Sequence, residues 1–239
     1  MKHSAIALLV GVALLTTGCG LRYFGSPLKP MASEQQGPAM TVSDDGTVTY
    51  RKERLEISLR PMTDEELNRQ FSSVSKQGNQ STNPYTYGNW RQQGDTSTPV
   101  RFTVFRLKVK NYTYPKVEVD PEKITIHTEN GREYAPLSLQ QMEKYYHAYA
   151  RGYSGASYRR FKARKDILKQ TMYMRDIIFS GQDREGYVIF PKLDSDVRHI
   201  SITLQDIAFR FNVFGEPVES TGVTFQFQRE IYKGREPRT

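Results

Sequence analysis

Side chains that could bind an anion are concentrated in one stretch of the chain, residues 138–175. This stretch holds nine lysines and arginines against two acidic residues. Guanidinium groups bind phosphate or carboxylate in bidentate fashion, and tyrosine rings interleaved with them can stack on sugars or bases. The sequence therefore predicts a binding surface for a polyanion or an acidic partner protein. Its candidate residues are Arg159, Arg160, Lys162, Arg164, Lys165, Lys169, Tyr149, Tyr153 and Tyr158.

The same stretch also has a purely structural interpretation. In that interpretation it covers one open end of the folded body, buries Leu168 and some of the tyrosines, and leaves its charges in water. Charged side chains on a folded protein usually lie on a solvated face. In either case we expect two helices, over 139–149 and 161–174, with a break at the glycines of 152–155.

A second group of aromatic residues, Tyr85, Tyr87 and Trp90, lies in the long polar segment 72–99. Such rings can hold a carbohydrate or a partner protein; alternatively, one or two of them pin the segment to the body. A structureless loop of this length is unusual inside a compact domain, so we expect the segment to be either disordered or functional. Trp90 is therefore a further candidate binding residue.

Catalytic and metal-binding signatures are not found in the sequence. Glu143 and His147 are four residues apart and would share one face of a helix, but no third ligand follows at a recognisable spacing. His127 and His199 are expected at exposed positions on strands. No Gly-x-Ser-x-Gly motif is present, and the serines have no histidine close in sequence. We therefore expect no enzyme activity, no metal site and no cofactor.

The only cysteine, Cys19, follows a segment that has the three parts of a secretory signal. Lys2 supplies positive charge, residues 5–15 are an unbroken apolar core, and residues 16–18 are small. At about 1.5 Å per residue, the apolar core reaches only about half of the hydrocarbon thickness of a bilayer, so it cannot span one. We expect residues 1–18 to be a cleaved signal peptide.

Residues 15–19, Leu-Thr-Thr-Gly-Cys, resemble the lipobox of bacterial lipoproteins, with threonine at position 16 where leucine is commonest. The resemblance implies that Cys19 carries a diacylglycerol thioether and an acylated amine, which together hold a protein firmly in a membrane. In that family an aspartate after the cysteine retains the protein at the inner membrane, so Gly20 implies the outer membrane. The alternative is an ordinary cleaved signal peptide that leaves a free thiol.

Composition limits the class of protein and of partner. The mature chain of about 220 residues is long enough to bury a core without disulfides, and no second cysteine could form one. The full chain carries a net charge of +8, and Lys2 is the only charged residue before Cys19. An exported basic protein can meet lipid head groups, cell-wall polymers or lipopolysaccharide. Nucleic acid is not expected as a partner, because the protein is exported.

Regular alternation of apolar and polar residues predicts that most of the body consists of half-buried strands. A capping-box pattern at residues 63–66 predicts a short helix that ends near Phe71. In the longest strand the alternation changes parity between Val104 and Phe105, which predicts a β-bulge. The expected strands are 47–50, 55–59, 100–111, 117–119, 124–128, 177–180, 187–190, 199–204, 207–211 and 223–228, with Phe209, Phe211, Phe225 and Phe227 in the core.

Strands that do not alternate with helices favour an antiparallel sandwich. Residues 186–190 and 200–211 resemble the later strands of immunoglobulin-like domains in bacterial surface lipoproteins, which implies an immunoglobulin-like β-sandwich. The expected organisation is a signal peptide 1–18, a flexible tether 19–45 and a sandwich domain 46–235, with a polar loop 72–99 and a helical basic insert 138–175.

We expect a lipid-anchored protein of the cell envelope that acts as a non-enzymatic binding or structural module. Its partner would be the membrane, reached through the lipid, together with an envelope protein or an anionic polymer. One alternative is a binder of lipopolysaccharide or cell-wall polymer through the basic insert. The other alternative is an envelope hydrolase.

Overall fold

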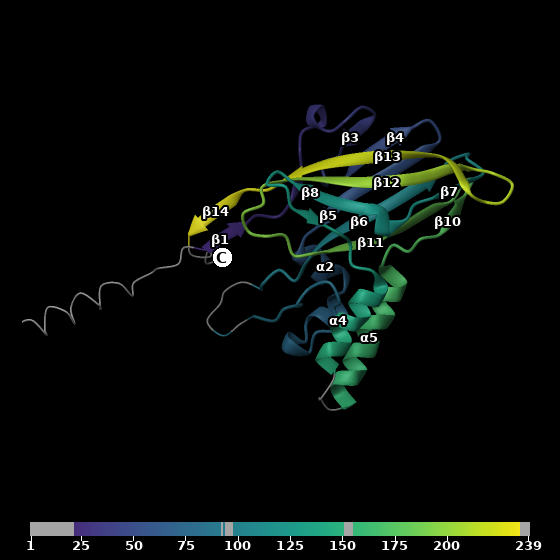
Figure 1. Ribbon diagram of the computed structural model, residues 1–239. Coiled ribbons are helices and arrows are strands. Elements are labelled where there is room, and N and C mark those ends of the chain that lie inside the picture. Colours follow the sequence, from purple (N-terminus) through teal and green to yellow (C-terminus); the bar gives the residue numbers. More distant parts are fainter. Residues whose placement is uncertain (1–21, 92, 94–97, 151–154, 235–239) are drawn as a thin grey trace, which may run out of the picture.

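The computed structural model describes residues 22–91, 93, 98–150 and 155–234. The protein is mainly β, and its strands pair in antiparallel sheets. Figure 1 shows two layers of strands on one side of the molecule and a pair of helices that extends away from them. The sequence pattern predicted this class, because period-two alternation without interspersed helices is typical of antiparallel sheets.

The first sheet has five strands in the order β11-β6-β5-β4-β3. Its long central pairs, β5 with β6 and β6 with β11, keep an unbroken register over their whole length. The strands are β3 (Met40–Val42), β4 (Val48–Lys52), β5 (Leu55–Met62), β6 (Phe102–Asn111) and β11 (Asp183–Pro191).

The second sheet has seven strands, with the path β10-β7-β12-β13-β2 and with β8 and β9 attached beside β12. A separate two-stranded ribbon pairs β1 (Arg22–Gly25) with β14 (Ile231–Gly234). The strands of the second sheet are β2 (Lys29–Pro30), β7 (Lys116–Glu118), β8 (Ile124–Thr128), β9 (Glu133–Tyr134), β10 (Ile177–Phe179), β12 (His199–Phe211) and β13 (Pro217–Gln228).

The two sheets face each other across the main hydrophobic core. Alternate side chains of a strand point to opposite faces, so each sheet contributes every second residue to this core. Ile57 and Leu107 come from the first sheet, Ile202 and Phe225 come from the second, and all four are fully buried. The rings of Phe105 and Phe227 meet across the core with centroids 5.4 Å apart.

A second core lies on the outer face of the first sheet. There, at one end of the sheet, Phe102 and Val104 of β6 and Tyr187 and Ile189 of β11 pack against helices and against the segment that precedes β6. This covering explains why so much of both strands is buried on two faces. The residues of the second core are Leu67, Tyr85, Phe102, Val104, Met142, Tyr146, Phe161, Leu168, Met172, Tyr187 and Ile189.

The predicted β-bulge between Val104 and Phe105 is wrong. The register of β6 against both of its neighbours runs through this point without a shift. Val104 belongs to the second core and Phe105 to the main core, so two successive residues are apolar because both faces of the strand are covered. A bulge lies instead in β12, between Leu204 and Ile207, where two predicted strands are one.

The helices are close to those predicted. Thr63 and Glu66 form the capping box: the backbone N–H of Glu66 donates to Thr63 Oγ1 at 3.2 Å, and the N–H of Thr63 donates to Glu66 Oε2 at 3.0 Å. The last helix begins six residues earlier than expected. The helices are α2 (Asp64–Gln70), α3 (Ser72–Ser75), α4 (Leu139–Ala150) and α5 (Gly155–Thr171), with 3-10 turns at Ser33–Gln35, Gly78–Gln80 and Pro121–Lys123.

The flexible tether predicted for residues 19–45 is wrong for the part that the structure describes. From Arg22 onward the segment forms β1, β2, a 3-10 turn and β3. Gln36 is buried, its amide donates to the carbonyl oxygen of Gln226 at 2.7 Å, and its side-chain oxygen accepts from the Gln226 N–H at 3.0 Å. Hydrogen bonds therefore hold this segment together with a few apolar contacts, because Leu28, Met40 and Val42 pack against the main core.

The described part of the polar loop 72–99 contains regular structure and buried residues. It begins with α3 and a 3-10 turn, and residues 81–86 are all buried. The amide of Asn83 donates to Ser75 Oγ at 2.9 Å and to Asn68 Oδ1 at 3.2 Å, and its oxygen accepts from the Tyr85 N–H at 2.9 Å. Buried polar groups are tolerated here because they satisfy one another.

The two ends of the strand body differ. The β1–β14 ribbon lies at one end, and the hairpin between β12 and β13 lies at the other (Figure 1).

Within the described residues, none of the helices has the length and apolar character needed to cross a membrane.

Candidate functional site

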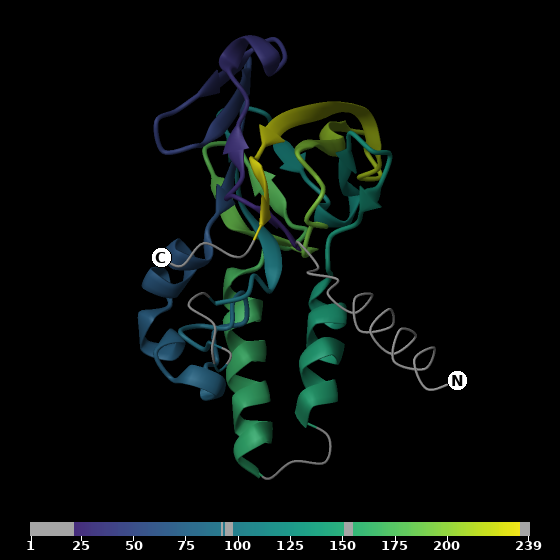
Figure 2. The same ribbon diagram turned by 90° about the vertical axis from the view of Figure 1, so that its left-hand side faces the viewer.

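The predicted basic insert forms two helices that pack on the sheet rather than covering an open end. In Figure 2, α4 and α5 run side by side and extend away from the strands. Tyr146 of α4 and Leu168 of α5 enter the second core, as the structural interpretation of the insert expected. The location is different, however, because the helices pack on one end of the outer face of the first sheet.

The structure separates the predicted basic residues into two groups. Arg159, Lys162 and Lys169 are exposed on α5, and Lys162 Nζ lies 5.7 Å from the ring centroid of the exposed Tyr158. Arg160 is half-buried and donates to Ser157 Oγ at 3.1 Å. The other members make contacts within the fold.

Lys165 and Arg164 are the members that make structural contacts. Lys165 Nζ donates to Glu143 Oε2 at 2.7 Å, which links α5 to α4. Arg164 Nη2 donates to the carbonyl oxygen of Ser81 at 2.6 Å, which links α5 to the polar segment. These two residues are therefore not part of a uniformly solvated basic face.

Some predicted residues lie outside the described part of the chain. Cys19 and the predicted signal peptide 1–18 precede the first described residue, and Tyr153 lies between α4 and α5. For Tyr149 only the backbone, within α4, is described.

The aromatic residues of the polar segment also differ from one another in burial. Tyr85 is fully buried, and its ring packs against Tyr187 at a centroid distance of 4.9 Å. Its hydroxyl forms a hydrogen bond with the hydroxyl of Thr171 at the end of α5. It therefore pins the segment, as the structural alternative proposed. Tyr87 and Trp90 are half-buried and their rings lie 5.7 Å apart.

Arg101 joins the polar segment to the basic insert. Its guanidinium carbon lies 4.5 Å from the ring centroid of Tyr87, 5.3 Å from that of Tyr145 and 4.8 Å from that of Tyr146. Arg164 approaches the Tyr146 ring as well, at 5.0 Å. We call Arg101, Arg164 and these three tyrosines the arginine–tyrosine cluster. The sequence reasoning found Arg164 but missed Arg101, which stands alone at the start of a strand.

The electrostatics of the arginine–tyrosine cluster are unusual for a folded interior. Burial lowers the pKa of Arg164, and the nearby positive charges of Arg101 and Arg160 lower it further. Burial also raises the pKa of the Tyr146 and Tyr87 hydroxyls, so both remain neutral at physiological pH. Chemically, the cluster offers cationic donors and ring faces, which suits binding rather than proton transfer.

The histidines occupy the surface positions that were expected. His127 Nδ1 lies 3.2 Å from Glu133 Oε1, and His199 Nδ1 lies 2.6 Å from Glu129 Oε2. The ring of His147 packs against Phe161 at 5.4 Å. No group of three or more His, Cys, Asp or Glu side chains within the described residues could hold a metal ion.

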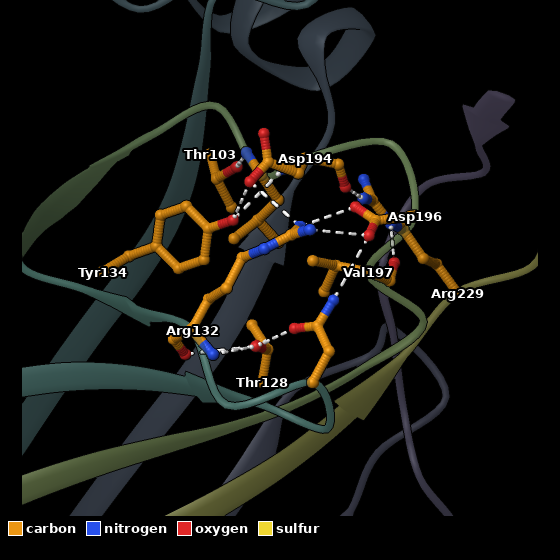
Figure 3. Close-up of polar contacts among 10 residues, drawn as sticks. Thr103, Thr128, Arg132, Tyr134, Asp194, Asp196, Val197 and Arg229 are labelled. Atoms are coloured by element: carbon orange, nitrogen blue, oxygen red, sulfur yellow. Dashed lines mark hydrogen bonds and ion pairs between the residues drawn. The ribbon is translucent and has the colours of Figure 1, made fainter. Parts of the chain in front are cut away.

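The densest polar network holds the loop 193–198 in place (Figure 3). Arg132 donates to both carboxylate oxygens of Asp196, at 2.6 and 2.8 Å, and Tyr134 donates to Asp194 at 2.8 Å. The hydrogen bond from Arg132 lowers the pKa of Asp196. Arg229 donates to the carbonyl oxygens of Asp194 and Val197. These groups satisfy one another's hydrogen bonds, so the network stabilises the loop 193–198.

An open cleft of about 700 Å³ lies at the β12–β13 end of the body. Its lining includes the rings of Tyr114 and Phe209, which are tilted by 46° with centroids 5.2 Å apart, and Phe211 beneath Lys116. Phe211 was predicted in the core, but it is only half-buried because it lies at the open end of β12. A smaller cleft of about 260 Å³ lies beside the end of α5. Neither cleft is lined by a histidine.

Comparison with known proteins adds little to this picture. No protein-family model matches the chain, and no curated protein is similar to it. Among solved structures, the yjhA protein from Bacillus subtilis is 9% identical, with 72% of this chain and 82% of that chain covered and a TM-score of 0.31. A TM-score this low carries no argument about fold or function.

Proposed function

We propose that this protein is a lipid-anchored component of a bacterial cell envelope and that its body is a non-enzymatic binding module. Cys19 would carry the lipid at the outer membrane, and an immunoglobulin-like β-sandwich with a helical insert would form the body. Two antiparallel sheets facing one core support the sandwich. The arginine–tyrosine cluster carries the binding part of the proposal, because it gathers donors and ring faces from three separate segments.

The position of the first strand supports a body that lies close to the membrane. β1 begins at Arg22, three residues after Cys19, and three extended residues reach about 10 Å. The ribbon is tied to the body through Arg229, just before β14, whose N–H donates to the carbonyl oxygen of Arg198 at 2.9 Å. Tyr23 and Tyr232 are both half exposed on this ribbon, and tyrosines are enriched at membrane interfaces. The open cleft would therefore point away from the membrane.

Replacing Cys19 with serine is expected to release the protein from membranes into the soluble envelope fraction, because the hydroxyl cannot take the thioether-linked lipid. The measurement is quantitative immunoblotting of membrane and soluble fractions from cells that express each full-length variant. Gly20→Asp is the matched control: it keeps the anchored cysteine and is expected to move the protein from the outer to the inner membrane. Wild-type protein in the cytosol, or a Cys19→Ser variant that stays in the membrane, would contradict the proposal.

A second candidate function is binding of an anionic envelope polymer along the exposed face of α5. Arg159, Lys162 and Lys169 favour it, because all three are exposed on the same helix. Full-length protein in detergent is expected to bind immobilised lipopolysaccharide, with affinity that falls steeply as salt rises.

Changing Arg159, Lys162 and Lys169 together to alanine is expected to abolish most of that retention. A control triple variant, in which Lys29, Lys52 and Lys76 are changed to alanine, removes the same charge elsewhere. Equal losses in the two triple variants would show attraction to net charge only and would end this candidate.

A further inference from the structure

Arg101 and Arg164 are positioned so that their charges repel. Both guanidinium carbons lie within 5.0 Å of the ring centroid of one residue, Tyr146, which is itself fully buried. Charged side chains held in a partly buried position are normally paired with an opposite charge. Among the residues that the structure describes, no carboxylate forms an ion pair with either guanidinium. The tyrosine rings offset the repulsion only in part.

The hydrogen-bond donors of the two arginines are also incompletely used. A guanidinium carries five N–H donors. Arg164 Nε is buried and has no hydrogen-bond partner among the described residues, although Nη2 is bonded to Ser81. The contacts of Arg101 with Tyr145 Oη and the Thr86 carbonyl oxygen are long, at 3.3–3.5 Å. Contacts of that length are weak, so the donors of Arg101 remain available to an anion, and Arg164 keeps one donor without a partner.

Aromatic rings continue the cluster on the side of Arg101. Tyr87 lies against Arg101, and the Trp90 ring lies 5.7 Å beyond that of Tyr87. Both rings are half-buried, so each keeps part of its surface accessible. The rings of Trp90 and Tyr87 are therefore followed by Arg101. Arg101 and Arg164 both contact the ring of Tyr146.

We propose that Arg101 and Arg164 bind the phosphate group of a phosphorylated sugar, with the sugar packed on Tyr87 and Trp90. A phosphate monoester carries a charge of about −1.5 to −2 near neutral pH, which matches two guanidinium groups. Bidentate forks recognise phosphate oxygens, and flat rings offer an apolar face. The inference rests on the proposed role as a binding module and gives that module a ligand class.

The chain contains a single tryptophan, so its fluorescence reports this site directly. Full-length protein in detergent is titrated with glucose 1-phosphate, with inorganic phosphate and with glucose, at constant ionic strength. We expect glucose 1-phosphate to change Trp90 emission saturably, inorganic phosphate to bind more weakly, and glucose to have no effect at the same concentrations.

Arg101→Gln and Arg164→Gln are each expected to weaken glucose 1-phosphate binding about tenfold to a hundredfold, because each removes charge-assisted hydrogen bonds. Arg69→Gln, at an exposed position on α2, removes the same charge and is expected to leave the affinity within about twofold of wild type. Arg101→Lys keeps the charge and loses the fork, so it should bind with intermediate affinity. Cooperative thermal unfolding of each variant establishes that it is folded.

The outcomes separate the possibilities. Absence of saturable binding by any phosphate, or an equal loss in Arg69→Gln and Arg164→Gln, would overturn the inference. Equal affinity for glucose 1-phosphate and inorganic phosphate would overturn the role of the two rings. A failure here leaves membrane release by Cys19→Ser unaffected, so the anchor is tested separately.

Discussion

Replacing Gly186 with alanine is expected to destabilise the protein by roughly 3 kcal/mol, because the added methyl group meets main-chain atoms that cannot move aside. A Cβ atom at this position would lie 2.5 Å from the nitrogen and 2.6 Å from the Cα of Tyr173. The chain that leaves α5 runs directly against β11 here: Met172 bridges to Tyr187, and the Tyr173 N–H donates to the Tyr187 carbonyl oxygen at 2.9 Å. The substitution would therefore separate the helical insert from the sheet.

The measurement is urea unfolding of full-length Gly186→Ala in detergent, followed by circular dichroism. Gly155→Ala is the matched control, because no atom lies within 4 Å of its Cβ position at the start of α5. Alanine there is expected to be neutral or stabilising by up to about 1 kcal/mol, since it favours the helix. Similar stability of the two variants would contradict the close approach between β11 and the chain after α5.

Asp64→Asn is expected to stabilise the protein above pH 7 and to leave it unchanged near pH 4. Burial raises the pKa of Asp64 to about 7, and the nearby Lys192 lowers it only in part. One carboxylate oxygen, Oδ2, is buried and has no hydrogen-bond partner among the described residues. The cost of ionising this carboxyl in the folded state is the reason for the expected gain.

The sign follows from the two pKa values. In the unfolded chain the carboxyl titrates near about 3.9, so between that pH and pH 7 the folded state holds a proton that the unfolded state has lost. The stability contributed by the neutral form is complete below pH 4 and disappears as the pH rises through 7. Asparagine resembles the neutral acid, so the expected gain at pH 8 is on the order of 2–4 kcal/mol.

Urea unfolding at pH 4 and pH 8 measures this difference. Glu65→Gln removes a charge from the same helical turn at an exposed position and should change the free energy of unfolding by less than about 0.5 kcal/mol at either pH. An Asp64→Asn variant whose stability relative to wild type is the same at both pH values would show that Asp64 is not a buried acid.

Local pattern was sufficient to predict many elements of the fold. The capping box of Thr63 and Glu66, the two insert helices and the alternating strands around Ile202 and Phe225 all depend on neighbours within a few residues. What local pattern could not show is which face of a strand another element covers. The adjacent apolar residues Val104 and Phe105 look like a change of register until a second core is known.

The described parts of the predicted tether 19–45 and of the polar loop 72–99 are held in place for a related reason. Gln36 and Asn83 are buried amides whose partners lie elsewhere in the chain, and composition counts them only as polar. Hydrogen bonds between distant residues leave no periodic signal in a sequence. Such segments are therefore systematically mistaken for loops.

Part of the candidate site could be predicted from the sequence. Charge density identified Arg164, and aromatic content in a polar segment identified Trp90. Arg101 has no charged neighbour in sequence, so only the fold could place it against Tyr146. A cluster assembled from three segments is visible only after those segments are positioned.

The proposed lipid anchor would determine the compartment in which all of these surfaces act, and it is best tested on the N-terminal peptide itself. The measurement is mass spectrometry of that peptide from protein purified out of native membranes. We predict a peptide that begins at Cys19 and carries the mass of a diacylglyceryl group and an amide-linked acyl chain. A peptide that begins at Met1, or one that begins at Cys19 with an unmodified thiol, would contradict the proposed anchor.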